Sequence, residues 1–265
     1  MNRIENHLQR LNEKGEKAFI TYMTAGLPDM QGMKDIMRAQ EEAGVDIIEL
    51  GIPFSDPVAD GPVIQEASYR SILKGTNLNS VFQAVGEARE EGLGVPIVFM
   101  MYYNTILHYG LEKFAGRCAQ IGVDGLIIPD LPYEEQEPLK SALMKVEGAP
   151  VIIQLVSPLS RQRIPMILEE ARGFVYCVSS MGVTGQEAAF YSEVAAYLKE
   201  VKRVSWIPVM MGFGIREASD VKMVADTIDG AIVGSHFIRL LEESQYDTDT
   251  VKTYIRTFKE ELNKM

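Results

Sequence analysis

Short apolar runs rich in β-branched residues alternate with longer amphipathic segments along the whole chain. Such runs are typical of strands buried on both faces of a parallel sheet. The pattern predicts eight strands, at Ala18–Thr24, Asp46–Ile52, Pro96–Tyr102, Gly125–Pro129, Pro150–Val156, Phe174–Val178, Ile207–Met211 and Gly230–Gly234. Their average spacing of roughly thirty residues corresponds to one strand, loop and helix per unit.

The segments between these runs have the periodicity of amphipathic helices. The predicted helices are Met30–Ala43, Leu78–Glu91, Glu112–Ile121, Glu134–Lys145, Ser160–Ala171, Ala188–Lys202, Arg216–Ala225 and Thr248–Asn263. Several of them are followed by glycine, as at Gly44, Gly122 and Gly173, which is a common helix stop.

Eight strand–helix units with no linker between them predict one closed (β/α)₈ TIM barrel, a single domain over residues 1–265. We also expect an extra helix at the N-terminus and short extra helices in the loops after strands two and eight. An open, doubly wound sheet is the alternative that this pattern leaves open.

Composition narrows the range of partners. The 265 residues are 46% hydrophobic and 24% charged, and the net charge is −11. An acidic chain without a basic run is not expected to bind nucleic acid or an anionic membrane. The two cysteines, Cys118 and Cys177, lack metal-binding spacing, as do the three histidines, so we expect a cytoplasmic protein without a metal site.

The candidate catalytic side chains are concentrated between residues 49 and 61. Glu49 ends a predicted buried strand, where an unpaired charge is costly, and the following loop carries Asp56 and Asp60 between prolines. Two carboxylates on one rigid unit suit paired proton transfer. The alternative is structural: Glu49 in an ion pair and the aspartates as helix caps.

Glycine-rich turns follow the last three strands. They carry Gly185, Gly212, Gly214 and the pair Gly234-Ser235. Glycine allows close approach of the backbone, and helix-start N–H groups attract anions, so these turns predict a phosphate site. Because no cluster of lysine or arginine marks these loops in the sequence, we expect mainly neutral backbone donors.

Together, several motifs resemble those of tryptophan synthase α subunits over nearly the whole chain. They are Thr24-Ala-Gly26, Glu49-Leu-Gly-Ile-Pro-Phe-Ser-Asp-Pro-Val-Ala-Asp-Gly-Pro62, Tyr102-Tyr-Asn104, Pro129-Asp-Leu-Pro132, Gly182-Val-Thr-Gly185, Gly212-Phe-Gly214 and Gly234-Ser235. The resemblance implies a lyase that splits indole-3-glycerol phosphate into indole and glyceraldehyde 3-phosphate without a cofactor of its own. It also implies a pyridoxal-phosphate (PLP) β subunit that receives the indole in an α2β2 heterotetramer.

The resemblance also implies residue roles. Glu49 is implied as the acid–base at indole C3 and at the substrate hydroxyl, and Asp60 as the partner of the indole N–H. The implied indole pocket consists of Tyr22, Met100, Tyr102, Tyr176, Thr184 and Phe213. The implied phosphate ligands are Gly185, Gly214, Gly234 and Ser235, and the implied β-subunit contacts are Pro53, Asp56, Asn104 and Pro132.

Four positions depart from the family pattern. Ser180 replaces a common Arg, Leu27 a common Asp, Thr105 a Pro, and His236 a small residue. Two other functions stay open. One is a different phosphate-binding barrel enzyme, although a synthase of that kind is expected to use a lysine inside the barrel, and no predicted strand carries one. The other is a non-catalytic regulatory subunit of the β chain.

Overall fold

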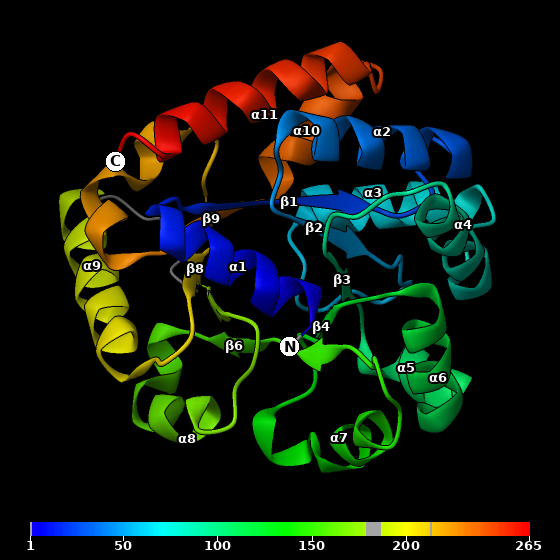
Figure 1. Ribbon diagram of the computed structural model, residues 1–265, viewed down its shortest axis with the longest axis horizontal. Coiled ribbons are helices and arrows are strands. Elements are labelled where there is room, and N and C mark those ends of the chain that lie inside the picture. Colours follow the sequence, from blue (N-terminus) through cyan, green and yellow to red (C-terminus); the bar gives the residue numbers. More distant parts are fainter. Residues whose placement is uncertain (1, 179–186, 213) are drawn as a thin grey trace.

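The computed structural model describes residues 2–178, 187–212 and 214–265, in which parallel strands form a barrel surrounded by helices (Figure 1). The strands are β1 (Ala18–Thr24), β2 (Ile47–Gly51), β3 (Ile97–Met100), β4 (Gly125–Ile127), β5 (Val151–Ile152), β6 (Gln154–Val156), β7 (Val175–Cys177), β8 (Val209–Met211) and β9 (Gly230–Val233). They are hydrogen-bonded in the order β5-β4-β3-β2-β1-β9-β8-β7-β6.

The two ends of this order meet in one stretch of chain. β5 pairs with β4, β6 pairs with β7, and only Ile153 separates β5 from β6. The N–H of Ile153 still donates to the carbonyl of Leu126 at 2.8 Å. The predicted strand Pro150–Val156 therefore closes the sheet, which confirms the TIM barrel and rejects the open, doubly wound sheet.

Eleven α-helices and three 3₁₀ helices lie in the described residues. They are α1 (Arg3–Lys14), α2 (Met30–Ala43), α3 (Pro62–Leu73), α4 (Leu78–Glu90), α5 (Tyr103–Tyr109), α6 (Leu111–Ile121), η1 (Tyr133–Glu135), α7 (Glu137–Met144), η2 (Pro158–Arg163), α8 (Ile164–Leu168), α9 (Glu187–Val204), η3 (Ala218–Thr227), α10 (Ser235–Glu243) and α11 (Thr248–Leu262). The expected extra helices are α1, α3 after β2, and α10 after β9. Helix α5 was not predicted.

Three predicted helices differ in kind or extent. The segment predicted as Arg216–Ala225 is the 3₁₀ helix η3, whose buried residues Ala218, Val221, Val224 and Thr227 recur every three positions. That spacing matches three residues per turn. The predicted helices at 134–145 and 160–171 are each a 3₁₀ turn followed by a shorter α-helix, because Pro138 and Pro165 occupy the first turn of α7 and α8.

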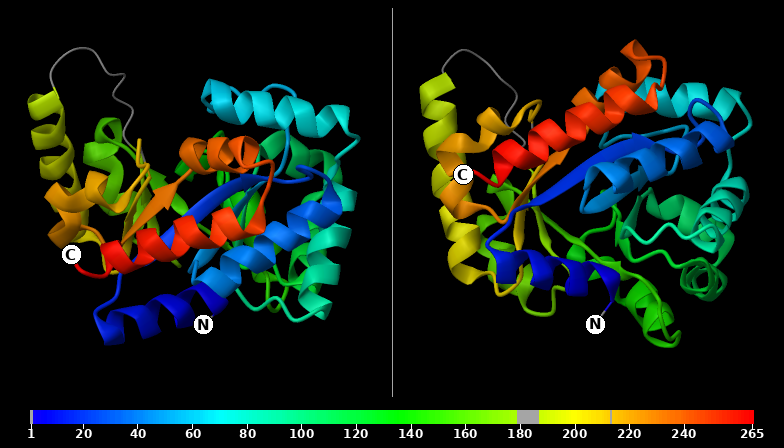
Figure 2. Two further views of the ribbon diagram at one scale, coloured as in Figure 1. Left: turned by 90° about the horizontal axis from the view of Figure 1, so that it is seen from above. Right: turned by 45° about the horizontal axis from the view of Figure 1, so that its top comes forward.

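Helix α1 closes one end of the barrel, and its apolar face plugs the interior. Ile4, Leu8 and Leu11 pack there with inward-facing strand residues that include Ile20 and Ile47. Figure 2 shows α1, in dark blue, across that end. Because side chains alternate along a strand, the next inward positions toward the opposite end are Tyr22 and Glu49, which are register partners across β1 and β2.

No helix within the described ranges is long and apolar enough to cross a membrane.

Candidate active site

A cavity of about 760 Å³ lies at the carboxyl ends of the strands, where TIM barrels hold their active sites. Its described lining is contributed by six of the nine strands and by segments that follow strands. The lining residues are Glu49, Ala59, Asp60, Gly61, Ile64, Met100, Ile127, Pro129, Leu155, Val156, Ser157, Ser160, Tyr176, Val178, Gly212, Gly214, Ile215, Arg216, Ile232, Gly234, Ser235, His236 and Arg239.

Glu49 is the unusual side chain of this cavity. It is only 1% exposed, and neither carboxylate oxygen has a hydrogen-bond partner among the described residues. Burial, with a smaller contribution from the charge of Asp60, raises the pKa of Glu49 to about 8. Two other buried acids, Asp46 and Asp124, are instead ion-paired. The ion-pair interpretation of Glu49 therefore lacks support among the described residues.

Asp60 faces the same cavity from the loop after β2. Burial raises its pKa to about 6, and hydrogen bonding with Tyr102 limits this rise. The Tyr102 hydroxyl also accepts a hydrogen bond of 2.9 Å from the backbone N–H of Ala59. The Tyr102 ring stacks on Phe54 with centroids 4.9 Å apart, so Tyr102 anchors the loop at two points that precede Asp60.

The two acids differ in ionisation near neutral pH. With pKa values of about 8 and about 6, Glu49 is mostly protonated at pH 7 and Asp60 is mostly ionised. Neighbouring carboxyls whose environments separate their pKa values supply an acid and an anion in one site. The geometry therefore suits donation of a proton by Glu49 to a substrate whose developing positive charge Asp60 stabilises.

Apolar side chains form the middle of the cavity. Met100 and Tyr176, both predicted pocket residues, line it, together with further apolar residues that were not predicted, among them four isoleucine and leucine residues. These four are Ile64, Ile127, Leu155 and Ile232. Three of them lie in strands, and strand alternation from the plugged end of the barrel identifies them as inward-facing.

Tyr22 and Tyr102 lie beside the cavity and are not in its lining. A side chain at Gly51 would overlap the Tyr22 hydroxyl, so the bare backbone of Gly51 makes room for that ring. Burial raises the pKa of Tyr22 far above its usual value, and the nearby carboxylates of Asp60 and Glu49 add to this rise. Tyr22 is therefore a close neighbour of the two acids, and Tyr102 holds the loop that carries Asp60.

The segments after β8 and β9 carry the predicted phosphate positions that the structure describes. Gly214, Gly234 and Ser235 line one end of the cavity, and Gly214 has a φ of 63°, which favours glycine. Three residues with basic side chains, Arg216, His236 and Arg239, also line this end of the cavity, and the sequence analysis did not name them as site residues. Gly185, Thr184, Phe213 and Ser180 lie outside the described residues.

The predicted partner-contact residues lie on one side of the barrel mouth. Pro53 and Asp56 follow β2, Asn104 follows β3, and Pro132 follows β4, and these three strands are adjacent. Asp56, Asn104 and Pro132 are exposed, and Pro53 is half-buried.

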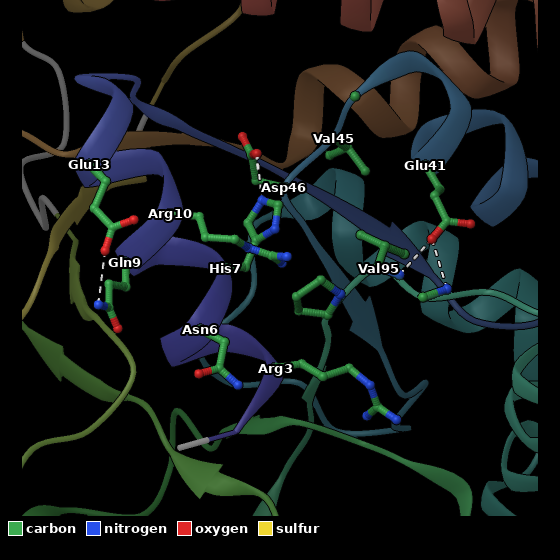
Figure 3. A pocket seen from close by; sticks show the side chains of 13 residues that line it. Arg3, Asn6, His7, Gln9, Arg10, Glu13, Glu41, Val45, Asp46 and Val95 are labelled. Atoms are coloured by element: carbon green, nitrogen blue, oxygen red, sulfur yellow. Dashed lines mark hydrogen bonds and ion pairs between the residues drawn. The ribbon is translucent and has the colours of Figure 1, made fainter.

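A second cavity, of about 750 Å³, lies at the plugged end of the barrel beside α1 (Figure 3). Its acids are engaged in structural bonds. Asp46 accepts from the N–H of Phe19 at 2.7 Å and pairs with His7 and Lys259, and Glu41 accepts from the N–H groups of Gly94 and Val95. These bonds fasten strand starts and helix α1, so the cavity around Glu49 is the better candidate for chemistry.

Comparison with known proteins gives one consistent result. The family model described as "Tryptophan synthase alpha chain" matches residues 8–265. The chain is 61% identical to the tryptophan synthase alpha chain of Lachnospira eligens over 99% of this chain and 100% of that protein. It is 44% identical to that of Alkaliphilus metalliredigens over 95% and 94% of the two chains. The crystal structure of tryptophan synthase subunit alpha from Legionella pneumophila superposes with a TM-score of 0.90, at 31% identity over 100% of both chains.

Proposed function

This chain belongs to the tryptophan synthase alpha chain family and is a lyase that cleaves indole-3-glycerol phosphate to indole and glyceraldehyde 3-phosphate, and we propose that Glu49 and Asp60 perform the cleavage. The observation that carries this proposal is the buried Glu49 carboxyl, which has no partner among the described residues and whose pKa is raised to about 8. The comparisons do not favour the alternatives of another barrel enzyme or a non-catalytic subunit.

The first proposed step is protonation of indole C3 by Glu49. This addition converts the indole ring to an indolenine cation with its positive charge on N1. The Glu49 carboxylate then removes the proton of the hydroxyl on the carbon attached to C3. The C–C bond breaks, its electron pair returns to the ring to give neutral indole, and the former alcohol carbon becomes the aldehyde. Glu49 has given one proton and taken one, so it ends in its starting state.

Asp60 has an electrostatic role in this scheme. Its ionised carboxylate accepts the N1–H bond and stabilises the cation that forms when C3 is protonated. In a cavity with apolar walls this interaction is stronger than in water. Because the scheme needs only proton transfers, we propose that this chain acts without a cofactor of its own.

The substrate lies across the cavity in the proposed complex. Its indole ring contacts Met100 and Tyr176, with Tyr22 and Tyr102 beside them. Phe213 is proposed as a further pocket residue from the family resemblance alone. Backbone N–H groups at Gly185, Gly214, Gly234 and Ser235 hold the phosphate. Thr184 is likewise proposed as a substrate contact from the family resemblance alone.

We further propose that this chain works in the cytoplasm with a β chain that carries PLP, in an α2β2 assembly. Pro53, Asp56, Asn104 and Pro132 are the proposed contacts, because their loops adjoin the mouth of the cavity. A partner docked there would cap the cavity and exclude water, which raises turnover without an added catalytic group. Asp56→Ala should then reduce activation by the β chain and leave the rate of the lone chain nearly unchanged.

The experiment that tests the proposed function is indole release by the purified chain, with and without a matching β chain. We expect slow release by the lone chain and faster release with the partner. Absence of release in both samples, with binding of indole-3-glycerol phosphate and complex formation confirmed, would reject the enzymatic role and favour a regulatory subunit.

A further inference from the structure

The cavity is divided by charge. Among the described residues that line it, the carboxylates of Glu49 and Asp60 come from β2 and the loop after it. The basic side chains of Arg216, His236 and Arg239 come from the segments that follow β8 and β9. The whole chain carries a net charge of −11, so its overall field does not attract an anion. The three basic side chains at one end of the cavity offset this negative field locally. An anionic group of a ligand is therefore attracted to that end.

We propose that Arg216, His236 and Arg239 bind the phosphate dianion of the substrate through their side chains, in addition to the backbone donors of the glycine turns. This inference rests on the proposed function, because it identifies further binding residues of the same site. The three side chains would determine specificity for a phosphorylated substrate over neutral indole compounds. Charged N–H donors bind phosphate oxygens more strongly than neutral donors do.

The structural bonds of Arg216 come from its backbone, not from its guanidinium. Its N–H donates to the Asp220 carboxylate at 2.8 Å, and its carbonyl accepts from the Tyr254 hydroxyl at 2.6 Å. These bonds fix the start of η3 beside the Gly214 turn. The exposed side chain is thus held at the cavity edge by bonds that a substitution at Arg216 does not remove.

Arg239 and His236 lie in the first turns of α10. This helix starts at Ser235, directly after Gly234. The side chains of its first two turns therefore lie close to the backbone N–H groups at its start. His236 is half-buried, and its ring centroid is 5.6 Å from that of Tyr254. Arg239 is exposed and also lines the cavity.

His236 adds a dependence on pH. Burial and the charges of Arg216 and Arg239 lower its pKa, whereas Glu243 and Asp220, which also face it, act in the opposite direction. A bound dianion offsets the two arginines and favours the protonated ring. Binding of a phosphate compound should therefore weaken as pH rises through the pKa of His236 in the complex.

The test compares Arg216→Gln, Arg239→Gln and the double variant with Arg256→Gln, an exposed arginine of α11 outside the cavity lining. Two quantities are measured: KM for indole-3-glycerol phosphate, and the inhibition constant of glycerol 3-phosphate. We expect each single variant to raise both by on the order of 3- to 20-fold, and the double variant by more. The inhibition constant of free indole should change less than about twofold in all variants, and KM should rise more than kcat falls.

Two further measurements separate charge recognition from a structural effect. Arg239→Lys should restore most of the affinity for glycerol 3-phosphate, and raising the salt should weaken binding more in the wild type than in the double variant. The pH dependence of the inhibition constant should be shallower in His236→Gln than in the wild type.

The proposal is overturned if glycerol 3-phosphate binds to the double variant as tightly as to Arg256→Gln, or if affinity for indole falls equally. An active wild type with unchanged KM in the variants rejects this inference alone. An inactive wild type rejects the proposed function, and calorimetric titration with glycerol 3-phosphate then still decides whether the basic side chains bind phosphate.

Discussion

The Tyr102 hydroxyl accepts a hydrogen bond of 2.9 Å from the N–H of Ala59, the residue before Asp60. A side chain between β3 and α5 thereby holds the loop after β2 in place, and Asp60 with it. In Tyr102→Phe the stack on Phe54 remains but this anchor is lost. We expect a loss of about 1 kcal/mol in unfolding free energy and about a tenfold lower kcat/KM, because Asp60 is positioned less accurately.

Urea denaturation and indole-release assays measure the two effects. Tyr103→Phe, which removes the neighbouring hydroxyl, is the matched control. Equal rates of indole release for the two variants would contradict the anchoring role of Tyr102.

The activity should have a bell-shaped dependence on pH. Glu49 must be protonated to act as the acid, so kcat/KM falls as pH rises through about 8. Asp60 must be ionised to stabilise the cation, so kcat/KM also falls as pH drops through about 6. Steady-state rates from pH 5 to 9.5 measure both limbs, which report the coupled pair. A profile that stayed flat between about 7 and 9 would contradict a protonated Glu49.

The same raised pKa makes the free energy of unfolding fall as pH rises from about 4.5 to about 8. Between the ordinary value of 4.5 and about 8, Glu49 ionises in the unfolded chain and keeps its proton in the native chain. The unfolded state therefore binds fewer protons, and the free energy of unfolding falls over this interval. Glu49→Gln lacks this contribution, so its stability relative to the wild type should rise by about 2–4 kcal/mol from pH 4.5 to pH 8.

Urea denaturation at both pH values measures this difference. Glu260→Gln, an exposed residue of α11, is the control and should show no such trend. A Glu49→Gln difference that stayed constant with pH would mean that Glu49 is already ionised in the native chain.

Gly51 and Gly212 leave room for the aromatic side chains at the site. A side chain at Gly51 would overlap the Tyr22 hydroxyl, and one at Gly212 would lie 2.6 Å from the Tyr176 ring. Alanine at either position should displace the ring and cost about 1–3 kcal/mol of unfolding free energy. Gly116→Ala, in helix α6 with open space around it, should instead stabilise the chain by up to about 1 kcal/mol. Thermal unfolding of the three variants measures this contrast.

The sequence pattern was sufficient to predict the barrel, because apolar runs and helical periodicity are visible within short segments of the chain. β1 has the predicted bounds, Ala18–Thr24, and the other predicted strands overlap observed ones. The break at Ile153 was not predictable, since it depends on which neighbour each half of that strand pairs with. Helix α5 was missed because a segment of only seven residues has too few turns to show periodicity.

The site was predictable where a motif or strand alternation specifies a residue. Glu49, Asp60, Met100 and Tyr176 line one cavity, and their roles stay predictions. Arg216 and Arg239 were missed because each is isolated in the sequence, and the parallel pairing of β8 with β9 is what brings the segments after these strands together. Tyr102 acts on Ala59 across 43 positions of sequence, which no local pattern reveals.

The most direct test of the central claim is the rate of indole release by Glu49→Gln at saturating indole-3-glycerol phosphate. An amide of the same shape keeps the cavity but cannot transfer the proton. We predict wild-type affinity for the substrate and a kcat lower by at least about 10²-fold, with a smaller loss in Asp60→Asn. A Glu49→Gln variant that retains more than about a tenth of the wild-type kcat would contradict the account.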